Sequence, residues 1–234
     1  MTDFLKYLGE RAYPGRGILI GRSADDTRAV IVYFIMGRSA NSRNRIFETT
    51  DDGIRTKAFD ESRMVDPSLI IYHPVRKLEN GVTVVTNGDQ TDTIKEYIEQ
   101  GKCYRHALLS RTFEPDGPNW TPRISGVLKP DCSYNLSILK SLDGDESCCC
   151  RYFYEYDAPK AGTGHFISTY VGFGDPIPSF RGEPVLMNVE ADSAAELAEQ
   201  VWNALNEDNK VSLYVSYIDR ESGKAETVIK NKNV

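Results

Sequence analysis

The hydrophobic positions of this chain fall mostly into short β-branched and aromatic runs that polar turns separate. This pattern predicts about ten strands. The run 28–36 is apolar at nearly every position, so we expect that strand to be covered on both faces. The pair Asp25-Asp26 predicts a hairpin turn before it, and Ser222-Gly223 predicts another near the C-terminus. The predicted strands are 17–23, 28–36, 69–72, 82–86, 120–128, 132–139, 149–156, 165–173, 211–218 and 226–229.

Two stretches have the period of amphipathic helices. Thr93 and Glu96 form a capping-box pattern that predicts a helix over 93–111, interrupted at Gly101. Ser193 and the glutamate three residues later predict a second helix, whose apolar residues recur every four positions. Many strands with few, widely separated helices predict an α+β fold in one domain over 1–234, with two antiparallel sheets packed together and helices outside.

Composition narrows the class of protein. The formal net charge of −6 argues against a general affinity for nucleic acid or an anionic membrane. The chain has no apolar run of about 18 residues, and its first residues lack the pattern of a signal peptide. Five cysteines, three of them consecutive, and three isolated histidines indicate reduced thiols in a cytoplasmic protein and no metal site.

The segment 82–94 combines a strand, a polar turn and a helix start. The turn contains Asn87-Gly88, a pair that readily adopts positive φ, and polar side chains continue through Asp92. A helix N-terminus that follows a strand presents free backbone N–H groups to an anion. An ordinary strand-to-helix loop would have the same pattern, so this alternative stays open.

The segment 37–45 is a polar loop rich in arginine. Between Thr27 and Phe47 the chain has four arginines and no acidic residue, although it is acidic overall. Arginine among serine and asparagine suits a planar ligand such as phosphate. A solvated basic loop is the alternative.

Several blocks together resemble the archaeal-type IMP cyclohydrolase family. They are scattered over residues 7–172, and the segments around Asn87 and around Arg123 are the most specific. Residues beyond 172 match the pattern less closely, and 10–14 is an insert relative to it. The blocks are Gly21-Arg22-Ser23, 39–45, 86–94, Thr121-Pro122-Arg123-Ile124 and Ile167-Ser168-Thr169-Tyr170.

This resemblance implies a fold and a reaction. The fold would be a four-layer αββα sandwich similar to that of N-terminal nucleophile hydrolases. The reaction would close 5-formamidoimidazole-4-carboxamide ribonucleotide (FAICAR) to IMP with loss of water, the last step of purine synthesis, without metal or organic cofactor. The expected partner is a small purine ribonucleotide, and assembly with further copies of the chain stays open.

The chemistry of ring closure assigns roles to these residues as hypotheses. We expect Tyr72 to donate a proton to the developing hydroxyl, Glu114 to accept the amide proton, and Arg123 to face the formyl oxygen or the carboxamide. Asp92 suits a turn or a ribose hydroxyl better than a phosphate, which its charge would repel. The residues expected to bind substrate or phosphate are Arg22, Arg38, Arg43, Asn44, Arg45, Asn87, Gly88, Asp89, Thr91 and Asp92.

Two other classes of function remain open on sequence. Removal of Met1 would expose Thr2, which could act as the nucleophile of an amide hydrolase, although Thr2-Asp3 also has the pattern of a helix cap. The chain could instead be a nucleotide-binding module without turnover. Among the isolated histidines, His165 is the best candidate for a catalytic role, because it directly precedes one of the matching blocks.

Overall fold

Two antiparallel sheets form most of the molecule, which we describe from a computed structural model covering residues 1–234. The six-stranded sheet has the order β11 (Val185–Asn188), β10 (Thr163–Ser168), β1 (Arg16–Arg22), β2 (Arg28–Met36), β12 (Lys210–Asp219) and β13 (Ala225–Asn231). The seven-stranded sheet has the order β3 (Arg45–Thr50), β4 (Gly53–Ala58), β5 (Val75–Lys77), β6 (Thr83–Thr86), β7 (Arg123–Leu128), β8 (Tyr134–Leu142) and β9 (Asp145–Tyr156).

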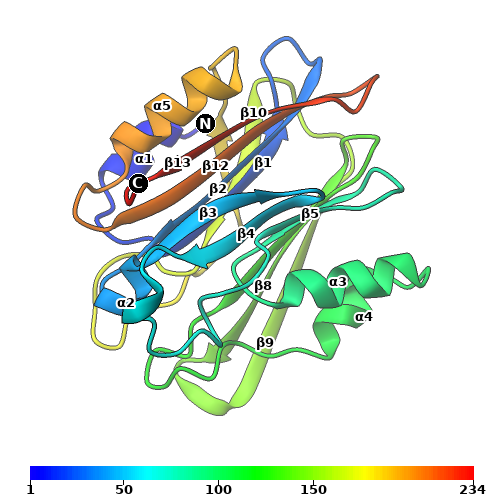
Figure 1. Ribbon diagram of the computed structural model, residues 1–234. Coiled ribbons are helices and arrows are strands. Elements are labelled where there is room, and N and C mark those ends of the chain that lie inside the picture. The colour runs from blue at the N-terminus through cyan, green and yellow to red at the C-terminus, as the bar shows by residue number, and fades with distance from the viewer.

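The helices lie on the outer faces of the sheets (Figure 1). Helices α1 (Phe4–Gly9) and α5 (Ala194–Ala204) pack on the six-stranded sheet, while α3 (Gln90–Glu99) and α4 (Tyr104–Leu109) pack on the seven-stranded sheet. The short helix α2 (Ala40–Arg43) and the 3₁₀ turn η1 (Glu61–Arg63) lie in connections.

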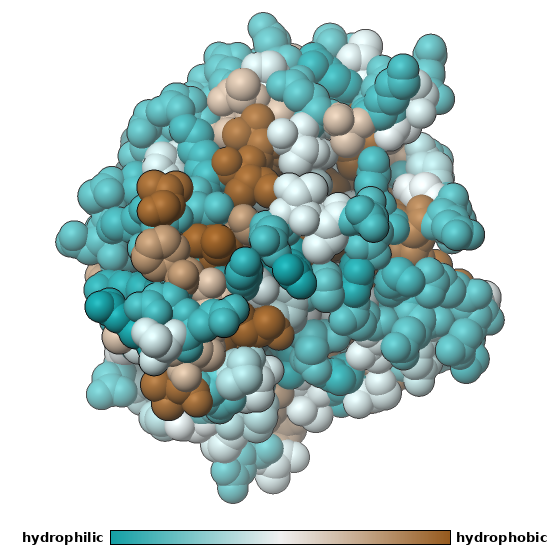
Figure 2. Space-filling model, in the orientation of Figure 1, coloured by the Kyte–Doolittle hydropathy of each residue, from teal (hydrophilic) through white to brown (hydrophobic).

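Side chains alternate between the two faces of each strand, and this alternation builds three apolar clusters. The cluster between the sheets includes Ile18 and Ile20 of β1 together with Ile124 of β7. A second cluster buries α1 and α5 against the outer face of the six-stranded sheet, and a third buries α3 and α4 against the other sheet. On the face seen in Figure 2 hydrophilic residues predominate and apolar ones appear in separate groups, as expected when most apolar side chains are gathered inside.

The prediction of two antiparallel sheets with few helices is confirmed. Both hairpins form as expected, β1–β2 and β12–β13, and the helix expected over 93–111 is split at Gly101 into α3 and α4. Asp3 caps α1 by accepting from the backbone N–H of Lys6, and Ser193 caps α5. None of the helices has the length and apolar character needed to span a membrane.

Other expected elements differ from the structure. No strand forms over 69–72: residues 68–70 are a turn, and the backbone N–H of Tyr72 donates to Oγ1 of Thr56 instead of to a backbone carbonyl of β4. Helix α3 begins at Gln90, so Thr93 lies inside the helix and caps nothing. The strand expected over 165–173 ends at Ser168. Strands β3, β4, β5 and β11 were not predicted. Polar residues leave β3 and β4 without a clear apolar alternation, and β5 and β11 are only 3 and 4 residues long.

Candidate active site

Glu114 lies in the connection between α4 and β7, with a side chain that is almost completely buried. Its backbone N–H donates to the carbonyl of Thr121 at 2.9 Å, which closes the loop behind it. Burial raises the pKa of this carboxyl to about 7, and the positive charges of Arg16 and Arg123 oppose part of that rise. A carboxyl that titrates near neutral pH can accept or donate a proton under physiological conditions.

Asn87 connects this carboxyl to three elements of the seven-stranded sheet and its helix. Its Nδ2 contacts Oε1 of Glu114 at 3.4 Å and donates to the carbonyl of Pro122 at 2.9 Å. Its Oδ1 accepts from the backbone N–H of Ile124 at 2.8 Å and from Nε2 of Gln90 at 3.1 Å. The amide therefore holds the end of β6, the start of β7 and the start of α3 around Glu114.

Arg123 reaches the same point from the start of β7. Its Nη1 donates to Oε1 of Gln90 at 2.7 Å and pairs with Oδ1 of Asp89 at 2.7 Å. Asp89 also pairs with Arg111. The guanidinium of Arg123 is thus partly occupied by protein groups in this structure.

Gly88 is needed here for close approach and not for an unusual backbone angle. We predicted a turn with positive φ at Asn87-Gly88, but neither residue has one. A Cβ at position 88 would lie 2.5 Å from Nη1 of Arg123 and 2.7 Å from Oε1 of Gln90. Because glycine has no Cβ, the guanidinium of Arg123 can pack directly against the backbone of the turn.

The other predicted residues of this turn, Thr91 and Asp92, make contacts within the protein that stabilise the turn. Oγ1 of Thr91 lies 2.6 Å from Oγ1 of Thr86 and donates to the carbonyl of Gly88 at 3.0 Å. Asp92 pairs with Arg76 at 3.0 Å, so its carboxylate is directed to β5. Acidic side chains thus occupy the start of α3, where the sequence suggested a free anion site.

A second group of polar side chains lies at the same end of the space between the sheets. The hydroxyls of Tyr72 and Tyr33 are 2.8 Å apart and both residues are buried. Arg45, fully buried, donates from Nε to the carbonyl of Ser42 at 2.8 Å, and both of its terminal nitrogens lack partners. Burial lowers the pKa of Arg45, and the nearby positive charge of Arg16 lowers it further.

Arg16 joins the two groups. It is 8% exposed, makes no ion pair, and its Nε has no hydrogen-bond partner. Burial disfavours its charge, yet the negative charge of Glu114, aided by three tyrosines including Tyr72, keeps its pKa above the ordinary value. Glu114, Arg16 and Arg45 are therefore close enough to influence one another's charge, and with Tyr72, Asn87 and Arg123 they form what we call the central cluster.

Sequence reasoning missed Arg16 and Tyr33, although strand alternation could have found Arg16. Arg16 shares a face of β1 with Ile18 and Ile20, which lie between the sheets. We placed the start of this strand one residue later and so left the arginine out. Arg45 and Phe47 are related in the same way on β3.

Two predicted binding residues have side chains that are occupied by other protein groups. Arg22 is at the opposite end of β1 from Arg16 and pairs with Asp26 at 3.2 Å. Asn44 exchanges two hydrogen bonds with the backbone of Asp60, so its side chain fixes a loop.

Arg38 and Arg43 are exposed; Arg38 lies in the loop before α2, and Arg43 is the last residue of α2. Arg43 donates to the carbonyl of Gly37 at 2.9 Å and to Oδ1 of Asn209 at 3.2 Å. Arg38 lies 5.2 Å from the ring centroid of Tyr13, at the surface above Arg16 and Arg45. Arg38 is thus linked to the central cluster through Tyr13, which influences the charges of both Arg16 and Arg45.

The residues of the alternative hypotheses lie elsewhere. Thr2 bridges to Met187, at the end of the six-stranded sheet that is opposite Arg16. His165 stacks on Tyr156 at 3.7 Å between ring centroids and contacts the hydroxyl of Tyr134 at 2.6 Å. No three His, Cys, Asp or Glu side chains gather in a metal-binding arrangement.

Comparison with known proteins places this chain in a family. The profile described as IMP cyclohydrolase-like protein matches residues 13–223. The chain belongs to this family. The match includes both arginines of the space between the sheets and the whole central cluster.

Curated relatives of this IMP cyclohydrolase-like chain come from archaea. A protein of Methanopyrus kandleri named IMP cyclohydrolase is 30% identical over 191 residues, which cover 72% of this chain and 89% of the relative. Proteins of the same name from Methanococcus maripaludis and Halobacterium salinarum are 34% and 31% identical. Those matches cover 52% and 64% of this chain and 61% and 76% of the relatives.

The close approach at Gly88 yields a test of the cluster's geometry. We expect Gly88→Ala to displace the flexible end of Arg123 while leaving the backbone in place, because the new Cβ would meet a side-chain nitrogen. Turnover should fall roughly 10- to 100-fold as the cluster loses its geometry, with little change in the melting temperature. Gly9→Ala is the matched control, since a Cβ there makes only an ordinary contact at 3.9 Å. Equal turnover in both variants would contradict this account.

Proposed function

We propose that this protein is an IMP cyclohydrolase that closes FAICAR to IMP with loss of water. The family match and the archaeal relatives named IMP cyclohydrolase support this function. The structural observation that carries it is the pair Arg16 and Arg45, buried without acidic partners beside a carboxyl that titrates near pH 7. Unpaired buried cations favour a ligand with negative or strongly polar oxygens.

Ring closure needs positioning and proton transfer. The carboxamide nitrogen attacks the formyl carbon of the same molecule, so a C–N bond forms and the C–O bond later breaks. The oxygen leaves as water with one proton from each of the two nitrogens. Because both reacting groups belong to one substrate, holding them in the reactive rotamer supplies much of the acceleration.

We assign the proton transfers to the central cluster. Glu114 accepts the proton of the carboxamide nitrogen, and Tyr72 donates to the oxygen that becomes a hydroxyl. Arg45, through its two terminal nitrogens, and Arg16, through Nε, have donors without partners and stabilise the charge that develops on this oxygen. Arg123, which already bonds to Gln90 and Asp89, holds the turn at Gly88 and moderates the pKa of Glu114.

The finer fold assignment belongs to the same proposal. We infer one domain over 1–234 with four layers, αββα, similar to the N-terminal nucleophile hydrolases. Three apolar clusters support this arrangement, since each fills the space between two successive layers. The site would lie between the two β layers, where the sheets face each other.

A spectroscopic assay tests the function. Purified protein is mixed with FAICAR in the presence of a chelator, and the absorbance change that accompanies formation of IMP is followed. We expect closure well above the uncatalysed rate and little closure with Glu114→Gln. Binding of IMP without any absorbance change from FAICAR would instead indicate a nucleotide-binding module without turnover.

The assigned proton donor can be tested by removing one hydroxyl. Tyr72→Phe should lower kcat about 100-fold, because general acid catalysis typically contributes 10²–10⁴-fold. The control Tyr33→Phe removes the neighbouring hydroxyl, 2.8 Å away, and leaves that of Tyr72 in place. We expect Tyr33→Phe to retain most of its activity. Unchanged kcat in Tyr72→Phe would remove Tyr72 from the mechanism.

The raised pKa of Glu114 predicts how activity depends on pH. Activity should fall as pH drops below about 7, where the carboxylate becomes protonated. Arg16→Gln removes a charge that lowers this pKa, so the acidic limb should move to higher pH. An unshifted limb in this variant would contradict the coupling.

The raised pKa of Glu114 also makes the free energy of unfolding depend on pH. The folded state binds the proton of Glu114 more tightly than the unfolded state, so its contribution to stability is complete at low pH and is lost as pH rises through about 7. Glu114→Gln should therefore melt at a higher temperature than the original protein at pH 8, with a smaller difference at pH 5. Thermal unfolding at both pH values checks this expectation.

A further inference from the structure

Three consecutive cysteines, Cys148, Cys149 and Cys150, lie on β9 and take no part in the central cluster. Strand β9 is at the edge of the seven-stranded sheet and pairs only with β8. All three thiols are free and partly exposed, whereas that of Cys132 is buried. Thiols that solvent reaches are open to oxidants, so this segment can undergo a reaction that the proposed function does not use.

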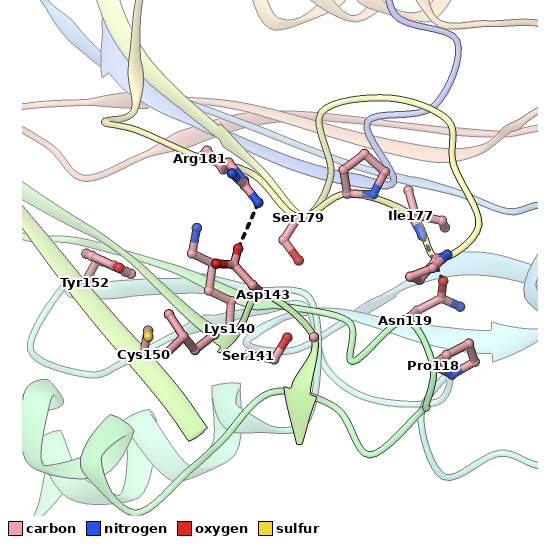
Figure 3. A pocket seen from close by; sticks show the side chains of 14 residues that line it. Pro118, Asn119, Lys140, Ser141, Asp143, Cys150, Tyr152, Ile177, Ser179 and Arg181 are labelled. Atoms are coloured by element: carbon pink, nitrogen blue, oxygen red, sulfur yellow. Dashed lines mark hydrogen bonds and ion pairs between the residues drawn. The ribbon is translucent and has the colours of Figure 1, made fainter. Parts of the chain in front are cut away.

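The three side chains are divided between the two faces of the strand. Cys149 packs against the apolar cluster beneath α3 and α4, and its Sγ lies 3.9 Å from the carbonyl oxygen of Cys150. Cys150 is directed to the opposite face, where it lines a surface pocket of about 550 Å³ together with Tyr152 (Figure 3). A hydrogen bond joins the thiols of Cys148 and Cys150. Cys148 and Cys150 are therefore a pair of neighbouring thiols, and Cys149 is directed away from them.

The strand is irregular where this pair lies. Ser141 of β8 pairs with Cys149, but the next residue, Leu142, pairs with Asp145. Residues 146–148 therefore form a bulge that has no partners in β8.

This bulge matters for the distance that a bond between the two thiols must span. In a straight strand, Cα atoms two residues apart are separated by about 6.7 Å. Disulfides span Cα separations of about 4.4–6.8 Å and mostly about 5.5–6 Å, so a straight strand is at their upper limit. A bulge bends the strand, and an edge strand has only one neighbour to resist movement. Cys148 can therefore approach Cys150 closely enough for a disulfide to form.

The surroundings of the two thiols differ. Burial raises the pKa of Cys148, and the charge of Cys150 and the hydrogen bond between the thiols raise it further, so Cys148 keeps its proton at neutral pH. Cys150 lies opposite Lys140 in the register of β8 and β9. Burial and the charge of Arg181 lower the pKa of Lys140, while a negative charge on Cys150 opposes that decrease. This ammonium and a thiolate at Cys150 thus attract each other, and the thiolate is the nucleophilic form of cysteine.

We propose that Cys148 and Cys150 form an oxidisable dithiol that hydrogen peroxide converts to a disulfide. The thiolate of Cys150 attacks one oxygen of the peroxide, the O–O bond breaks, hydroxide leaves and a sulfenic acid forms. The thiol of Cys148 then attacks that sulfur, so the S–S bond forms, the S–O bond breaks and water leaves with the thiol proton. The pair loses two electrons and two protons, and the peroxide is reduced to two molecules of water.

The position of this disulfide indicates that it is reversible. It would cross a bulge on a partly exposed edge strand, and strained or exposed disulfides are the ones that thiols readily reduce. Disulfides that form in the cytosol are usually of this transient kind. The nearby thiol of Cys148 also protects Cys150, because condensation to a disulfide competes with irreversible oxidation to the sulfinic acid.

Peptide mapping after oxidation tests the proposal. Reduced protein is treated with one equivalent of hydrogen peroxide, alkylated in denaturant with iodoacetamide and cleaved with trypsin, which releases the cysteines of β9 in one peptide, 141–151. We expect this peptide to lose two hydrogen atoms and to take up one alkyl group instead of three. Treatment with dithiothreitol should restore all three alkylation sites. Cys132, in another peptide, is the internal reference and should be alkylated as in untreated protein.

Single serine variants assign the roles within the pair. Cys149→Ser is the matched control, because it removes the neighbouring thiol and should still form the disulfide. Cys148→Ser should form no disulfide and should leave a sulfenic acid on Cys150, which the cyclic diketone dimedone traps. Cys150→Ser should form no disulfide and give little of this adduct. Melting curves verify that each variant is folded.

Three results would overturn the proposal. Full alkylation of 141–151 after peroxide treatment would show that the thiols do not react as a pair. Loss of the disulfide in Cys149→Ser would put the bond at Cys149. Equal dimedone adducts in Cys148→Ser and Cys150→Ser would contradict the attack by Cys150. None of these measurements uses FAICAR, so failure of this inference and failure of the proposed function are distinguishable.

Discussion

Two arginines buried between the sheets without acidic partners are the constraint on which the site depends. Burial of an unpaired charge costs several kcal/mol, so such a pair persists only where the surrounding fold holds it firmly and a ligand offsets the cost. Arg16 and Arg45 begin β1 and β3, which belong to different sheets, and each shares a strand face with apolar residues of the inter-sheet cluster. The packing of the sheets therefore fixes the separation of the two charges more rigidly than a surface loop could.

The same burial gives Glu114 its chemistry. In water this carboxyl would be ionised at neutral pH, but burial raises its pKa to about 7 and the charges of Arg16 and Arg123 keep it from rising further. Removing the arginines would leave a protonated acid, and exposing the site would leave a weak base. The pKa of Glu114 is consequently set by two opposing effects, desolvation and nearby positive charge. Asn87 fixes the geometry of the cluster, because its hydrogen bonds connect the carboxyl to three elements.

Local sequence patterns predicted much of the framework and part of the cluster. Uninterrupted apolar runs predicted β1, β2 and β12, and helical spacing predicted α5, because these patterns depend on neighbouring residues alone. Asn87 and Arg123 lie in blocks that resemble the family, Tyr72 and Glu114 were hypotheses from residue type and the chemistry of ring closure, and the fold brings these residues together. Arg16 was missed and Arg22 was included in its place. The two lie at opposite ends of one strand, and only the long-range register of the sheet decides which end faces the site.

The start of α3 illustrates why geometry alone does not assign a ligand. The sequence there has the strand, turn and helix start that often bind anions, and the structure has all three. Yet Asp89 and Asp92 lie at that helix start, and their own partners, Arg123 and Arg76, come from neighbouring strands. The protein thus satisfies this helix end internally, while the buried charges of Arg16 and Arg45 have no acidic partner. Because an anion is attracted by charge that the fold has not already neutralised, unpaired cations indicate where a nucleotide can bind better than the local backbone pattern does.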